Sequence, residues 1–210
     1  MKIERFVLGA YETNCYVLRE DVSAENCLVI DAGLDAKELV EFLKENKLRP
    51  AAVVLTHGHI DHIRGIALLR EEFPDIKVYI HKLDAKMLLK PLINLSLMTG
   101  KFFKTAAADV LLDEADVIEE AGIKLIVYHT PGHTEGGICL YAKEDNIIFT
   151  GDTLFADSVG RTDMPGGSMA KLVKSIKEKL CTLGDETIVY PGHGPETTIG
   201  REKQYNQFLS

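Results

Sequence analysis

Residues 56–62 read Thr-His-Gly-His-Ile-Asp-His, so three imidazoles and one carboxylate lie within six consecutive positions. The segment follows the short apolar run 51–55, which predicts a buried strand that ends in a polar loop. Apolar residues near helical spacing over 61–73 indicate that the loop leads into a helix. The polar side chains are therefore expected at the carboxyl end of a strand, where open α/β sheets place their ligand sites.

This motif indicates a metal site rather than a set of unrelated loop histidines, because the whole chain has only seven histidines. His57 and His59 are two apart on an extended segment, so they point to the same side and can bind one ion. Asp61 and His62 lie further along the turn and are better placed to bind a second ion. A second ion needs further ligands, which must come from other parts of the chain.

Three later strands are predicted to end in single residues that can bind a metal. These strands cover 123–128, 147–150 and 187–190, and the residues after them are His133, Asp152 and His193. Each is weak evidence alone, because a histidine after a Pro-Gly turn is more often structural. Together with the first motif they supply about as many nitrogen and oxygen ligands as two ions sharing one carboxylate would need.

The remaining pattern predicts alternating strands and helices. Further strands are expected at 2–7, 16–19, 27–30, 76–80 and 138–142, and helices at 35–46, 82–89, 168–180 and after 193. Asp35 and Ser168 are the expected N-caps of two helices. Asp31, directly after a strand, is expected to fix its loop rather than to bind a metal, and His81 is expected to be structural.

Residues 90–109 form a long segment with no clear helical or strand pattern. Long loops in compact domains often cover binding sites. This segment, with the exposed-looking Lys-Phe-Phe-Lys at 101–104, is therefore a candidate cover for the substrate. Simple packing on the surface is an equally good interpretation.

Composition is that of a globular protein and argues against several functions. The 210 residues suit one domain, 1–210, and no apolar run approaches the roughly 20 residues that a membrane span needs. A net charge of −8 without any basic run counts against a nucleic-acid partner.

The N-terminus lacks a signal-peptide pattern, so a cytoplasmic location is expected. Four scattered cysteines are predicted to be reduced core thiols, and they are Cys15, Cys27, Cys139 and Cys181.

Four motifs, taken in order, resemble those of the metallo-β-lactamase superfamily. They are Thr-His-Gly-His-Ile-Asp-His at 56–62, Thr-Pro-Gly-His-Thr-Glu-Gly at 130–136, Gly-Asp-Thr-Leu-Phe at 151–155 and Pro-Gly-His-Gly at 191–194. Ser-Val-Gly-Arg-Thr-Asp at 158–163 and Pro-Gly-Gly at 165–167 resemble the small glyoxalase II-like hydrolases of that superfamily. The resemblance covers nearly the whole chain and implies an α/β fold, the four-layer αββα sandwich, with the site along one edge.

The resemblance also implies roles for the candidate ligands. By similarity, one metal would be held by His57, His59 and His133, a second by Asp61, His62 and His193, and Asp152 would bridge the two. Two divalent ions are therefore expected. Zinc is the first choice, and iron or manganese would suit the same ligands.

The implied reaction is hydrolysis of a small thioester, such as S-lactoylglutathione, by a hydroxide that bridges the metals. Bound zinc lowers the pKa of water to about 7, a metal stabilises the oxyanion, and a thiolate of parent pKa about 8.5 leaves unprotonated. Asp61 and Asp152 are the candidate catalytic carboxylates, and Asp61 could also accept a proton from the attacking water. Arg161 stands where these enzymes carry a basic residue that contacts the glutathione carboxylate. An ion pair with Asp163 is the alternative.

The sequence differs from full-length glyoxalase II enzymes in a region that binds the thiol carrier. Full-length glyoxalase II enzymes have a helical carboxyl-terminal extension with further glutathione contacts, whereas here 17 residues, 194–210, follow His193. A shorter or different thioester is therefore expected as the small-molecule partner, with no nucleic-acid or membrane partner.

Persulfide dioxygenases are the main alternative, since they share the fold and the Gly-Arg-Thr-Asp sequence. They use one iron held by two histidines and an aspartate, here His57, His133 and Asp152, and such a site suits Fe(II) and O₂. A non-catalytic or nucleic-acid-directed member of the superfamily is disfavoured, because every ligand is present and no basic surface is indicated.

Overall fold

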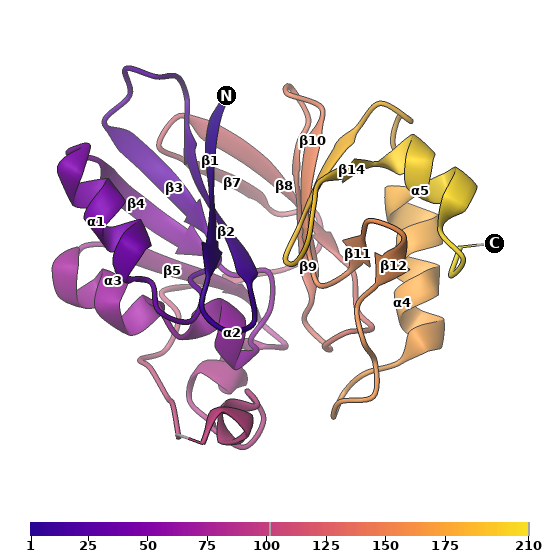
Figure 1. The fold of residues 1–210 in the computed structure, drawn as a ribbon, viewed down its shortest axis with the longest axis horizontal. Coiled ribbons are helices and arrows are strands. Elements are labelled where there is room, and N and C mark those ends of the chain that lie inside the picture. Colours follow the sequence, from indigo (N-terminus) through magenta and orange to yellow (C-terminus); the bar gives the residue numbers. More distant parts are fainter. Residues whose placement is uncertain (101, 210) are drawn as a thin grey trace.

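The protein folds into two six-stranded sheets that face each other, with helices on both outer faces (Figure 1). The computed structural model describes residues 1–100 and 102–209. Helices α1 and α3 cover the outer side of the first sheet, and α4 and α5 cover the outer side of the second. The predicted αββα sandwich is confirmed.

The first sheet contains β1 to β6 in chain order. Its strands are β1 (Lys2–Leu8), β2 (Thr13–Arg19), β3 (Asn26–Ile30), β4 (Arg49–Val54), β5 (Lys77–His81) and β6 (Val110–Leu112). The pairs β1–β2 and β2–β3 are antiparallel, and the strands from β3 to β6 are parallel. Parallel strands need crossover connections. Helix α1 (Lys37–Glu45) provides one, and α2 (Ile60–Ile63) with α3 (Ile66–Glu72) provides the next.

The second sheet has the order β14-β13-β10-β9-β8-β7. Its strands are β7 (Val117–Glu120), β8 (Ile123–His129), β9 (Ile138–Ala142), β10 (Ile147–Gly151), β13 (Ile188–Pro191) and β14 (Thr197–Thr198). Only β10 and β13 are a parallel pair among the described strands of this sheet. Their crossover contains the small hairpin of β11 (Leu154–Phe155) and β12 (Ser158–Val159), then α4 (Met169–Ser175) and a π-helical turn (Ile176–Leu180). Helix α5 (Ile199–Tyr205) follows β14.

The inner strands of the first sheet, β2 to β5, bury both of their faces over most of their length. In β2, Cys15 and Val17 pack in the cluster under α1 and α3, whereas Tyr16 and Leu18 pack in the cluster between the sheets. The alternation follows from the two-residue repeat of a strand. Strands of this kind are apolar on both faces, and burial of a single leucine side chain stabilises the fold by about 1.5–3 kcal/mol.

The prediction of one helix over 61–73 is wrong, because the structure has the two short helices α2 and α3 there. The break lies at Gly65, whose N–H donates to the carbonyl of Ala32 at 2.8 Å. A Cβ at this position would lie 2.6 Å from the Cβ of Ala36. The glycine thus allows the chain to pack closely against the loop after β3.

Asp35 is not the N-cap of α1, contrary to the prediction. Its φ is +57°, and the helix begins two residues later at Lys37. Ser168 does cap α4 as predicted, because its hydroxyl accepts a hydrogen bond from a backbone N–H three residues later. The predicted helix over 82–89 is only a 3₁₀ turn, Ala85–Leu88.

The segment 90–109 is irregular, as predicted, apart from a 3₁₀ turn over Ser96–Thr99. Asn94 fixes it in place, since its side chain donates to the carbonyls of Met87 and Phe103 at 3.0 Å each. The carbonyl of Asn94 also accepts from the N–H of Ile60 at 2.8 Å. The segment is therefore fastened to the loop that follows β4. Of the predicted stretch 101–104, position 101 lies outside the described residues.

The cysteine prediction is confirmed, because all four thiols are free, three of them are buried and Cys181 is partly buried. Burial raises the pKa of the Cys139 thiol to about 11, which keeps it protonated and unreactive. No helix among the described residues is both long and apolar enough to cross a membrane.

Replacing Phe149 with alanine is expected to lower the free energy of unfolding by about 3–5 kcal/mol. Phe149 is fully buried between the sheets, beside the rings of Tyr16 and Tyr190, so truncation leaves a cavity there. Urea denaturation followed by circular dichroism measures the change. Val22→Ala is the control, because that side chain is 75% exposed and its loss should cost less than about 0.5 kcal/mol. Equal losses in the two variants would contradict this description of the core.

Candidate metal centre

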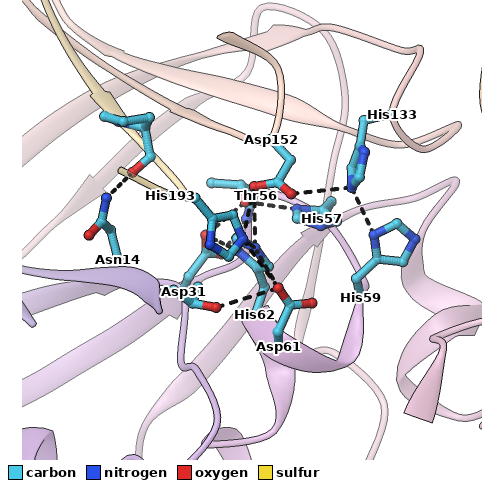
Figure 2. A network of polar contacts seen from close by, with 12 residues as sticks. Asn14, Asp31, Thr56, His57, His59, Asp61, His62, His133, Asp152 and His193 are labelled. Carbon is cyan, nitrogen blue, oxygen red and sulfur yellow. Dashed lines mark hydrogen bonds and ion pairs between the residues drawn. The ribbon is translucent and has the colours of Figure 1, made fainter. Parts of the chain in front are cut away.

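Seven polar side chains converge at one edge of the sandwich, at the carboxyl ends of β4, β8, β10 and β13 (Figure 2). They are His57, His59, Asp61, His62, His133, Asp152 and His193. The loop after β4, together with the short helix α2 that it enters, provides four of them. The loops that follow strands of the second sheet provide the other three. The structure thus brings together every ligand that the sequence predicted.

The buried carboxylate of Asp31 fixes the loop after β4. Its two oxygens accept hydrogen bonds at 2.8 Å from the backbone N–H and from the hydroxyl of Thr56. The Nδ1–H of His62 donates to the same carboxylate at 2.8 Å, so Nε2 is the ring nitrogen that faces Asp61 and His193. Asp31 therefore has the loop-fixing role that was predicted for it.

The first cluster consists of His57, His59 and His133. Each offers one ring nitrogen, and the three nitrogens lie within 4.8 Å of one another. Nδ1 of His59 and Nε2 of His133 are only 2.8 Å apart. The Nδ1–H of His133 donates to the carbonyl of Arg161 at 2.7 Å, so its Nε2 lone pair faces the cluster. Three imidazoles held in this way form a preorganised set of ligands.

The second cluster consists of Asp61, His62 and His193. Oδ2 of Asp61 lies 3.3 Å from Nε2 of His193 and 3.5 Å from Nε2 of His62. The two ring nitrogens are 3.3 Å apart. These atoms form a compact triangle next to the first cluster.

Asp152 lies between the two clusters and directs one oxygen towards each. Oδ2 is 3.5 Å from Nε2 of His133 in the first cluster. Oδ1 is 3.4 Å from Nε2 of His62 and 3.6 Å from Nε2 of His193 in the second. This is the arrangement that a carboxylate shared by two ions requires.

Burial and neighbouring charges set the protonation of the cluster. Burial lowers the pKa of His57 well below its ordinary value and that of His59 to about 3. Burial also lowers the pKa of His62, but the nearby carboxylates, with Asp31 first, outweigh it and hold that pKa well above the ordinary value. Burial raises the pKa of Asp152, yet the adjacent His62 keeps it well below the usual range. His57 and His59 are thus held as neutral imidazoles, whereas His62 holds its proton more strongly than a free imidazole.

The donor set fits divalent metal ions. Metal bonds of about 2.0–2.2 Å in a tetrahedral site place neighbouring ligand atoms about 3.3–3.6 Å apart, and the second cluster has 3.3–3.5 Å. Two buried atoms, Nε2 of His57 and Oδ1 of Asp152, find no hydrogen-bond partner among the described residues. A bound cation would satisfy both.

Asn14 was missed by the sequence analysis, although it positions His193. Its side-chain amide donates to the carbonyls of Pro191 and Gly194 at 2.9 Å each, and its backbone N–H donates to Gly192 at 2.7 Å. Asn14 lies on β2 of the first sheet, whereas these partners lie at the end of β13 of the second and directly after it. The contact therefore joins the two sheets at the metal centre.

Asp84 was also missed, and it joins the loops that carry the first cluster. Its buried carboxylate accepts from the N–H of Gly58 at 3.2 Å, from the hydroxyl of Thr134 at 2.7 Å and from the N–H of Gly136 at 2.7 Å. Two of these donors are backbone groups, so no side-chain pattern in the sequence could have identified the contact.

Arg161 lies on the wall of a cavity above the two clusters, and its guanidinium is paired with Asp163. Two hydrogen bonds of 2.8 Å join the two side chains, as the ion-pair alternative predicted. His81 is buried and stacks on His129 with ring centroids 4.1 Å apart, away from the clusters, in agreement with the prediction.

Residues 8–193 match the family model described as the metallo-beta-lactamase superfamily. The chain belongs to this superfamily. Among its relatives is the probable metallo-hydrolase YqgX of Bacillus subtilis (strain 168), 37% identical over 211 residues that cover 100% of this chain and 98% of YqgX. Another is the hydroxyacylglutathione hydrolase GloC of Haemophilus influenzae, 33% identical over 216 residues that cover 100% of this chain and 99% of GloC.

Three solved structures of this superfamily fold are similar to the present one. BLEG-1 B3 metallo-beta-lactamase has a TM-score of 0.94 and 39% identity, with 100% of both chains covered. TTHA1623, in a di-iron-bound form, has a TM-score of 0.86 and 35% identity, with 98% and 100% covered. ETHE1 from Myxococcus xanthus has a TM-score of 0.81 and 28% identity, with 99% and 84% covered. The His/Asp clusters and the di-iron form of a similar protein support divalent metals at this site.

Lowering the pH is expected to release metal from the second cluster before the first. Despite burial, neighbouring carboxylates raise the pKa values of His62 and His193, so metal binding there must displace protons. Affinity then falls by at least about tenfold per pH unit below those pKa values. His57 and His59 have pKa values lowered by burial, so they are already neutral and release no proton when an ion binds.

The test is dialysis of metal-loaded protein from a pH of about 8 to about 5.5, with elemental analysis at each step. An intermediate with about one metal per chain is expected. Loss of both metals in a single step would contradict the difference between the clusters.

Asp84→Asn is expected to weaken metal retention by about 10–100-fold, the usual cost of losing a group that orients metal ligands. The N–H groups of Gly58 and Gly136 donate to different oxygens of Asp84, so the new amide N–H₂ would face one of these donors in either orientation and the two loops would shift apart. Metal affinity is measured by competition with a chromophoric chelator. The control is Asp75→Asn at an exposed position. Equal affinities for the two variants would show that the contact does not support the site.

Proposed function

We propose that the protein hydrolyses small thioesters with the help of two divalent metal ions. The observation that carries this proposal is the pair of clusters joined through Asp152. The first cluster would hold one ion and the second cluster the other. Zinc is the proposed metal, and iron or manganese would suit the same nitrogen and oxygen donors.

When bound, such ions supply a hydroxide near neutral pH and polarise a substrate carbonyl. The chain's own residues hold the ligands in the correct tautomers, through Asp31 behind His62 and the Arg161 carbonyl behind His133. Asp61 is part of the cavity wall and is the carboxylate placed to accept a proton from the attacking water. A thiolate, with a parent pKa of about 8.5, leaves without a proton donor. An amide would instead release an amine that must be protonated as it leaves, so this chemistry favours thioesters over amides.

The relatives support the same class of substrate. GloC is named a hydroxyacylglutathione hydrolase, and a hydroxyacyl glutathione is a thioester. YqgX is named a probable metallo-hydrolase, which agrees with hydrolysis but specifies no bond.

Persulfide oxidation by a single iron is the second candidate. His133 and Asp152 lie 3.5 Å apart next to His57, so the two histidines and one aspartate that such a site uses are in place. TTHA1623, a similar protein, has been observed in a di-iron-bound form, which supports iron as a metal but not a single-iron site. The remaining four ligands have no role in this reaction, which is why hydrolysis is preferred.

The deciding experiment combines metal content with three activity assays. Protein purified without added metal is analysed for elements, then assayed for release of thiol from S-lactoylglutathione and from neutral acyl thioesters. Oxygen uptake with glutathione persulfide and hydrolysis of a chromogenic β-lactam are measured in parallel. Two metals per chain with thioester cleavage would support the proposal. One iron with oxygen uptake, or cleavage of the β-lactam alone, would refute it.

Asp152→Ala is expected to reduce metal content and thioesterase activity together, since the carboxylate lies against both clusters. We expect at most one metal per chain and a fall in kcat/KM of at least about 100-fold. Elemental analysis and initial rates measure the two effects, and the exposed Asp75→Ala is the matched control. A variant that kept two metals and full activity would overturn the role given to Asp152.

A further inference from the structure

The cavity above the metal clusters has a floor that is polar and walls that are mostly apolar. Its volume is about 360 Å³. The floor is made by five of the seven candidate ligands, which are His59, Asp61, His133, Asp152 and His193. Seven lining residues have large apolar or aromatic side chains, and they are Tyr11, Ile60, Leu95, Met98, Phe155, Val159 and Met164. A pocket of this kind favours an apolar group bound next to the reacting carbonyl.

The walls offer little to an anionic ligand. Arg161 is the one lysine or arginine among the described residues that line the cavity, and its guanidinium already forms two hydrogen bonds with Asp163. That pair is largely exposed, so its charge is neutralised and screened before any substrate arrives. Glutathione carries two carboxylates and one ammonium group, and the chain itself has a net charge of −8. The side chains of the cavity wall therefore offer no unpaired lysine or arginine to an anionic thiol carrier.

The segment beside the cavity extends its apolar surface to the outside. Leu95 and Met98 line the cavity, and the same segment exposes Leu92 by 71% and Phe102 by 74%. Exposed apolar side chains gathered on one short segment are uncommon on a soluble protein and often mark a binding site. Asn94 fastens the segment to the loop after β4, so this surface has a fixed place next to the metal clusters.

The volume sets the size of the group that fits. An apolar cavity of about 150 Å³ is large enough for a benzene molecule. The 360 Å³ found here is thus enough for an aryl or medium-length alkyl group together with the atoms of the thioester.

We propose that the preferred substrate is a thioester with an uncharged aryl or medium-length alkyl acyl group on a neutral thiol carrier. This inference rests on the proposed thioester hydrolysis and narrows its substrate class. Met98, Leu95 and Phe155 would contact the acyl group, and the carbonyl would lie over the clusters. Transfer of apolar surface from water into the cavity would drive binding.

The test uses metal-loaded protein and a panel of thioesters that vary one group at a time. Acetyl, hexanoyl, phenylacetyl and succinyl groups are compared on N-acetylcysteamine, a neutral carrier, and the same acyl groups are compared on glutathione. We expect kcat/KM for hexanoyl or phenylacetyl to exceed that for acetyl and succinyl by at least about tenfold. The neutral carrier should equal or exceed glutathione for each acyl group.

A preference for the glutathione thioesters, or for the acetyl or succinyl group, would overturn the substrate assignment but leave thioester hydrolysis intact. Failure to cleave any member of the panel would instead refute the proposed function itself. The two proposals can therefore fail separately.

A pair of variants tests the cavity wall directly. Met98→Glu places a charge in the wall and is expected to raise KM for the hexanoyl substrate at least about tenfold, with kcat little changed. Val22→Glu, at an exposed apolar position outside the cavity lining and outside this segment, is the matched control and should leave both constants unchanged. Both side chains are largely exposed, so both variants should fold. Equal KM values in the two variants would refute the role of the cavity wall.

Discussion

The metal centre depends on the buried carboxylate of Asp31. Taking a charged carboxylate out of water costs several kcal/mol, and here three donors from Thr56 and His62 offset that cost. These contacts fix the backbone of the loop after β4 and the orientation of one ring within it. The ligands of this loop are consequently in position before an ion binds. Metal binding therefore costs little conformational entropy in the loop.

Two further polar contacts extend this arrangement to the rest of the site. Asp84 joins the loop after β4 to the loop after β8, through Gly58 and Gly136. Asn14 joins β2 to the turn after β13, through Pro191 and neighbouring carbonyls. The ligands come from loops far apart in the sequence, and these three residues, rather than the ligands themselves, set how the loops meet.

The ligands could be predicted from the sequence, whereas the residues that position them could not. A ligand such as His133 follows an apolar run and a Pro-Gly turn, and both signals are local. Asp84 and Asn14 form hydrogen bonds with backbone groups that are 26 to 180 positions away in the sequence. A pattern of neighbouring residues cannot identify such distant partners. The same limit explains the wrong helix over 61–73, because its break at Gly65 depends on a close contact with Ala36. Short strands such as β6 and β14 have too few residues for an alternating pattern to show.

The division of the ligands between the two sheets affects how the fold itself is held together. Each cluster takes two side chains from the loop after β4 and one from the second sheet, and Asp152 adds another from that side. An ion in either cluster would therefore cross-link the two halves of the sandwich along one edge. Its binding free energy would add to the apolar attraction between the sheets, as for other metals bound only by the folded state. The same metal–ligand bonds would then serve both catalysis and the stability of the fold. Removing the metal would therefore weaken the contact between the sheets at this edge as well as stop catalysis.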